Sequence, residues 1–167
     1  MMQRIATLNE FIVGVLNRGQ SLLLLAVRLY WGYQFAQSGW GKLHRLDGVA
    51  EYFGATLNLP MPHTTALVVS LIEFVGGILF ALGLGSRLVS LVLFVNMSVA
   101  YWAADHEALT QIFSDPGKFY NADPYTFWFA ALMVLVFGPG FFAIDTLLQR
   151  FFFPRKRASE YAMGAAS

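Results

Sequence analysis

The segment from Thr64 to Leu84 constrains the fold of this chain more than any other. Its sequence, TTALVVSLIEFVGGILFALGL, is almost entirely apolar and has about the length of one bilayer crossing. One charged residue, Glu73, lies near its centre. A carboxylate at that depth in hydrocarbon costs roughly 3 kcal/mol or more, so it normally faces protein or water and has a partner. The segment therefore predicts a membrane helix with a polar site at Glu73.

The composition extends this prediction to the whole chain. Of the 167 residues, 57% are hydrophobic and only 13% are charged, whereas soluble domains carry about 25% charged residues. A soluble core of this size could not bury so much apolar surface. We therefore expect an integral membrane protein with the lipid bilayer as its main partner. The net charge of +1 gives no basis for a nucleic-acid partner, and the absence of cysteine excludes thiol chemistry and Cys-ligated metal sites.

The apolar pattern predicts an all-α fold, an integral membrane four-helix bundle with a short amphipathic N-terminal helix. Residues 1–19 place apolar side chains at helical spacing, which is typical of a helix lying in the membrane interface. Residues 20–145 form the membrane domain, and residues 146–167 form a basic tail. The four crossings are expected at residues 21–40, 64–84, 88–104 and 124–144.

Lys and Arg residues are distributed unequally between the two sides of this topology. With the amino terminus inside, the inner segments carry seven of them and the outer loops three. Cytoplasmic loops carry the excess of positive charge in membrane proteins. The sequence thus predicts a multi-pass protein of the cytoplasmic (inner) membrane with both termini in the cytoplasm.

Three crossings place their most polar side chain at a similar depth. At about 1.5 Å per residue, Arg28 lies about 11 Å from the inner face and Glu73 about 14 Å from the outer face, and Asn96 is also near mid-membrane. We expect Arg28 to be the partner of Glu73. Two interpretations stay open: an Arg–Glu–Asn contact that fixes helix order, or a site for a quinone head group, a proton or a small ligand.

Small residues accompany these polar groups. Gly32 and Gly39 share the face of Arg28, and Gly76 and Gly77 follow Glu73. Such glycines make room for a neighbouring helix or for a ligand. The three histidines, by contrast, show no established ligand spacing, and we predict no metal site.

Three segments of the sequence resemble the DoxX family of small four-helix membrane proteins. They are RLYWGYQFAQSGWGKL (28–43), IEFVGGILFALGLGSRLVSLVL (72–93) and the closing FGPGFFAID (137–145). The resemblance covers about residues 22–145 and implies a cytoplasmic-membrane protein. Some relatives are linked to quinone-dependent oxidation, including a subunit of a thiosulfate:quinone oxidoreductase, or to membrane complexes that handle oxidative or thiol stress.

The functional prediction is an integral membrane subunit of a redox system, with a quinone as cofactor. Arg28 would donate to a quinone carbonyl oxygen, Glu73 would pass a proton, and a protein partner would supply the electrons. The alternative is a non-catalytic scaffold or assembly partner of a membrane complex. A small transporter is less well supported, because no inverted repeat with paired broken helices is visible. The sequence leaves open whether the chain is an enzyme by itself and whether it forms a homo-oligomer.

Overall fold

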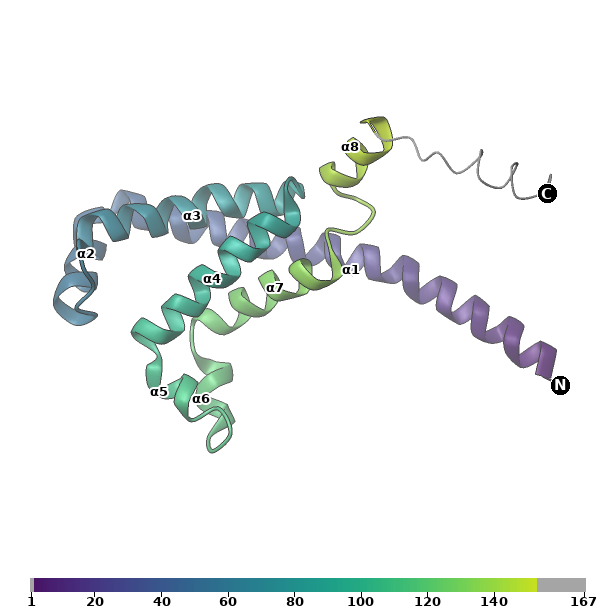
Figure 1. Ribbon diagram of the computed structural model, residues 1–167, viewed down its shortest axis with the longest axis horizontal. Coiled ribbons are helices and arrows are strands. Elements are labelled where there is room, and N and C mark those ends of the chain that lie inside the picture. The colour runs from purple at the N-terminus through teal and green to yellow at the C-terminus, as the bar shows by residue number, and fades with distance from the viewer. Residues whose placement is uncertain (1, 153–167) are drawn as a thin grey trace, which may run out of the picture.

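The computed structural model describes residues 2–152, with side chains described for residues 12–16 and 19–152, and this part of the chain is helical without any strand (Figure 1). The all-α prediction is confirmed. The basic tail predicted for residues 146–167 lies mostly outside the described residues. In chain order, the elements are α1 (Met2–His44), α2 (Leu46–Glu51), the π-helix η1 (Tyr52–Thr56), α3 (Pro62–Leu82), α4 (Ser86–Ala104), α5 (His106–Thr110), α6 (Pro116–Asn121), α7 (Pro124–Phe137) and α8 (Ile144–Phe152).

Three helices of the described chain are long and apolar enough to cross a membrane. They are the Ile12–His44 part of α1, together with α3 and α4. The fourth apolar helix, α7, has 14 residues. At 1.5 Å per residue it is about 21 Å long, shorter than a hydrocarbon core of about 30 Å. The predicted crossing at 124–144 thus stops at Phe137, because Gly138 adopts a φ of 80° and Gly140 a φ of 77°, which are not helical.

The amino-terminal region differs from the prediction in a second way. The backbone of α1 is helical from Met2 to His44, with no boundary between the expected interfacial helix at 1–19 and the first crossing. No proline interrupts this stretch, and isolated glycines such as Gly14 and Gly19 are tolerated inside a helix. The first half of α1 extends alone beyond the other helices (Figure 1).

Glycines allow α1 and α3 to lie against each other along their length. A Cβ atom on Gly77 would lie 2.5 Å from the amide nitrogen of Ala36 and 2.7 Å from the carbonyl oxygen of Gly32. Gly39 in turn lies against the backbone of Ser70 and Phe74. Small residues permit such backbone-to-backbone approach in membrane helices. Gly76 is different, because it faces the side chain of Leu93 on α4.

The remaining helices complete one apolar core. A tight turn with two left-handed glycines, Gly83 and Gly85, joins α3 to α4 and makes them antiparallel neighbours. Side chains from α1, α3, α4 and α7 meet in the interior. The buried members of this cluster are Leu24, Phe35, Phe80, Leu93, Met97, Ala131 and Val134.

The close approach of α1 and α3 predicts that Gly77→Ala destabilises the protein by about 1–3 kcal/mol, since the new methyl group overlaps backbone atoms that cannot move aside. Thermal unfolding in detergent measures this effect. Gly48→Ala is the matched control, because nothing lies within 4 Å of that position and alanine favours a helix. Equal unfolding temperatures for the two variants would contradict the packing described here.

Candidate functional site

Glu73 is buried where α1, α3 and α4 meet, and its carboxylate is fully partnered. The side chain is 2% exposed. Lys42 Nζ lies 2.5 Å from Oε1 and 2.6 Å from Oε2. Ser38 Oγ donates to Oε2 at 2.9 Å, and Asn96 Nδ2 approaches Oε1 at 3.4 Å. We call these four residues the Glu73 cluster.

The geometry of α1 explains how the Glu73 cluster forms. Ser38 and Lys42 are four residues apart, so they share one face of the helix. Because α1 continues to His44, Lys42 stays on that face instead of entering a loop. Gly39 lies between them and brings the α3 backbone close. The side chain of Lys42 is 31% exposed, so it forms the accessible side of an ion pair whose acid is enclosed.

All four cluster residues line one large cavity. Its volume is about 1170 Å³, slightly above the range of roughly 300–1,000 Å³ that is typical of small-molecule sites. Apolar and aromatic side chains supply much of its wall, among them Phe35, Tyr52, Phe53, Met97 and Phe127. The cavity therefore combines apolar walls with a compact group of hydrogen-bonding side chains at the Glu73 cluster.

The same cavity is also lined by residues that follow the membrane helices. Asp105 and Asp123 both contribute to its wall, as does Arg45. Burial, and then the negative charge of Asp123, raises the pKa of the Asp105 carboxyl. These groups lie outside the membrane-spanning helices, so the cavity reaches from the Glu73 cluster toward the membrane surface.

Arg28 does not join the Glu73 cluster. Its guanidinium is completely buried, and Nη2 donates to the carbonyl oxygen of Phe142 at 2.5 Å. Ten residues, or about 15 Å of helix, separate Arg28 from Ser38 on α1. The expected Arg28–Glu73 pair is therefore not formed, whereas Asn96 does lie next to Glu73 as the depth estimate predicted.

Sequence reasoning missed Lys42 because it ended the first crossing at residue 40 and placed Lys42 in an outer loop. Ser38 lay inside the predicted crossing, but an uncharged serine was not singled out there. A usable signal was present. A serine and a lysine four residues apart continue the helical register of the first crossing, and a lysine near a helix end can extend along it.

A second polar group holds the carboxyl-terminal segment against the α3–α4 turn. The carboxylate of Asp145 accepts hydrogen bonds from the amides of Gly85 and Ser86, both at 2.7 Å. The amide of Asp145 donates to the carbonyl oxygen of Gly83 at 2.9 Å. We call this arrangement the Asp145 clamp.

The electrostatics of the clamp favour an ionised Asp145. Burial alone would raise the pKa of this carboxyl, but the hydrogen bonds from Ser86 and Gly85 and the charge of Arg28 outweigh it and lower the pKa. A negative charge at the start of α4 also matches the positive end of the helix dipole. Arg28 thus contributes to the attachment of the segment after α7.

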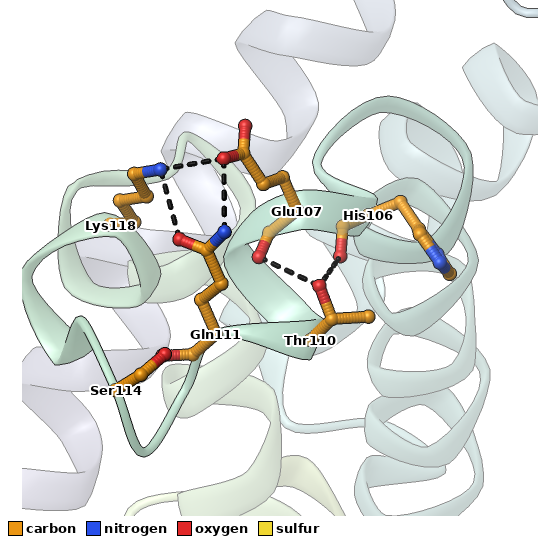
Figure 2. Close-up of polar contacts among 6 residues, drawn as sticks. All are labelled: His106, Glu107, Thr110, Gln111, Ser114 and Lys118. Carbon is orange, nitrogen blue, oxygen red and sulfur yellow. Dashed lines mark hydrogen bonds and ion pairs between the residues drawn. The ribbon is translucent and has the colours of Figure 1, made fainter.

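A third polar group, shown in Figure 2, lies on the exposed segment between α4 and α7. Lys118 Nζ lies 2.6 Å from Glu107 Oε1 and 2.9 Å from Gln111 Oε1. The hydrogen bond from Lys118 lowers the pKa of Glu107. An exposed pair of this kind contributes little to stability. No group of three His, Asp or Glu side chains in the described part of the chain is placed to hold a metal ion.

The comparison with protein families decides where this chain belongs. The DoxX family model matches residues 23–106, about half of the chain. The chain belongs to the DoxX family. The match contains the whole Glu73 cluster of this DoxX protein and ends before Asp145 and the closing segment, where a resemblance was also expected. The comparisons with curated proteins and with solved structures gave no match. Three spanning helices and family membership together make this DoxX chain a multi-pass membrane protein.

The Asp145 clamp predicts a pH dependence. A carboxyl whose pKa is lowered on folding stabilises the folded state at every pH above its usual pKa of 3.8. This contribution is lost as the pH falls through the lower pKa of the folded state. Asp145→Asn should remove about 1–2 kcal/mol at neutral pH, because charge-assisted hydrogen bonds at a partly exposed site are lost. Hydrogen exchange of the Gly85 and Ser86 amides should become faster.

The matched control for this experiment is Asp47→Asn, which changes an exposed acid on α2. That variant should leave exchange at Gly85 and Ser86 unchanged. If these two amides exchanged as fast in the wild-type protein as in Asp145→Asn at neutral pH, that result would contradict the clamp.

Proposed function

We propose that this DoxX protein binds a quinone in the cavity at the Glu73 cluster and serves as a membrane subunit of a redox system. The single observation that supports this best is a cavity of about 1170 Å³ at which the Lys42 ammonium group is held by a buried carboxylate. A quinone has a flat apolar ring with two carbonyl oxygens, and this cavity offers apolar walls and a fixed hydrogen-bond donor.

Lys42 is the donor that the geometry favours, in place of Arg28. An ammonium group has three N–H bonds. The two oxygens of Glu73 engage Nζ, and the remaining donor capacity is free for a carbonyl oxygen in the cavity. Glu73 fixes the position of Lys42, and the side-chain amide of Asn96 lies beside it as a second donor. Arg28, which bonds to Phe142, is assigned a structural role.

When bound, a quinone would supply two-electron redox chemistry. The role of this chain would be to hold the ring between apolar side chains and to place an N–H proton of Lys42 at one carbonyl oxygen of the quinone. Because the chain contains no cysteine, the electrons would come from a protein partner.

The excess of Lys and Arg supports cytoplasmic termini in the inner membrane, which would place the cavity toward the outer side.

One observation favours the second candidate, a non-catalytic scaffold. The Glu73 cluster joins α1, α3 and α4 through hydrogen bonds that satisfy a buried charge. Contacts of this kind can fix the order of helices without any ligand. In that case the cluster would act as a structural centre, and exposed segments would dock the partner.

The quinone proposal predicts that the full chain, purified in mild detergent, carries about one quinone per chain by native mass spectrometry and lipid extraction. Lys42→Gln should lose this quinone, because it removes the ammonium donor. Lys118→Gln is the matched control, since it removes a lysine from an exposed ion pair. Retention of the quinone by Lys42→Gln would contradict the assigned donor.

A double variant separates ligand loss from unfolding. Either single change, Lys42→Gln or Glu73→Gln, breaks a pair whose acid is buried, and breaking such pairs is strongly destabilising. The combined variant leaves no unpaired charge, so it should unfold closer to the wild-type temperature and still lack quinone. A wild-type chain that carries no quinone and co-purifies with a protein would favour the scaffold.

A further inference from the structure

The last described helix, α8, has one apolar and one polar face. Ile144, Leu147, Leu148, Phe151 and Phe152 are spaced by three or four residues and lie on one side. Phe151 is 81% exposed and Phe152 is 73% exposed. Thr146, Gln149 and Arg150 lie between them in sequence and form the opposite side.

The position of α8 is fixed at its start. The Asp145 clamp holds the first turn at the beginning of α4, and the helix then stands apart from the others (Figure 1). Phe141 and Phe142, just before α8, are also exposed. The guanidinium of Arg150 lies 4.0 Å from the centre of the Phe141 ring. An exposed aromatic surface therefore lies at one end of the membrane helices, with a cation on its edge.

Positive charge is concentrated at this same end. A Cβ atom on Gly138 would lie 3.6 Å from Arg87, which places this exposed arginine beside the segment that leads to α8. In the sequence α8 is followed by Arg155, Lys156 and Arg157. Basic residues next to a membrane helix are attracted by anionic phospholipids. Aromatic and aliphatic side chains opposite a basic face are typical of helices that lie in the membrane interface.

We propose that α8 lies in the membrane–water interface and binds anionic phospholipids. Its Phe and Leu face enters the acyl-chain boundary, and Arg87 and Arg150 contact the phosphate groups. This inference does not depend on the quinone proposal, because none of the described residues that support it lines the cavity at Glu73. The partner is the lipid surface itself, since the apolar face continues directly from the end of the spanning helices.

The absence of native cysteine allows a direct test in the full chain. Phe152→Cys is labelled with a polarity-sensitive fluorophore and the protein is reconstituted in nanodiscs that contain phosphatidylglycerol. The emission should shift to the blue, and lipids carrying a nitroxide near the headgroup should quench it. Gln149→Cys, on the polar face of the same helix, is the matched control and should show a smaller shift.

Lipid selectivity is measured on the same protein by native mass spectrometry with mixed phosphatidylglycerol and phosphatidylcholine. Replacing Arg87 and Arg150 together by Gln should reduce retained phosphatidylglycerol by about fivefold for each arginine that contacts a headgroup. Lys118→Gln, on the exposed segment between α4 and α7, should change nothing.

Three results would overturn the proposal. The first is water-like emission at position 152. The second is a blue shift that nitroxide lipids do not quench, which would mean that protein covers the helix. The third is retention of phosphatidylglycerol that does not change when Arg87 and Arg150 are both neutralised.

Discussion

The ion pair between Lys42 and the buried Glu73 is the interaction on which the interior of this protein depends. A carboxylate that is 2% exposed has lost its hydration, and only nearby donors can compensate it. Lys42 and Ser38 from α1 and Asn96 from α4 supply those donors. The pair therefore fixes which faces of three helices point inward. The donors that compensate the Glu73 carboxylate also form a polar group in the wall of a large cavity. The same contacts therefore hold the helices together and form the candidate site.

The contact between α1 and α3 makes that ion pair geometrically feasible. Hydrogen bonds of 2.5–2.9 Å between side chains of two helices require the helix axes to be close. Gly39 supplies this closeness beside Ser38 and Lys42, and Gly32 with Gly77 supplies it one or two turns further along. Arg28 lies beyond that contact and binds the segment after α7. The two charged residues expected to pair thus have different partners: Glu73 binds side chains of α1 and α4, and Arg28 binds the segment after α7.

Much of this arrangement could be predicted from the sequence, and the exceptions have physical reasons. Hydrophobicity indicates α3 and α4 within about two residues, and the central position of Glu73 correctly indicates a polar site that includes Asn96. The partner of Glu73 was assigned by depth alone, which favoured Arg28. Depth does not tell in which direction around the helix axis a side chain points. Ser38 and Lys42 lie on the face of α1 that points toward α3. The Gly138-Pro139-Gly140 sequence signals a break at the end of the fourth crossing, and the positive φ of Gly138 ends α7 at Phe137, although the predicted span continued to residue 144.

The shortness of α7 has a consequence for the lipids around the protein. A helix of 14 residues packed against α4, a spanning helix of 19 residues, creates a hydrophobic mismatch on one side of the protein. Bilayers respond to a short apolar helix by thinning locally. Because α7 also contributes Phe127 to the cavity wall, the thinnest part of the surrounding membrane would adjoin the wall of the cavity. Lipid headgroups would then lie closer to the membrane centre at this wall of the cavity than they do beside α3.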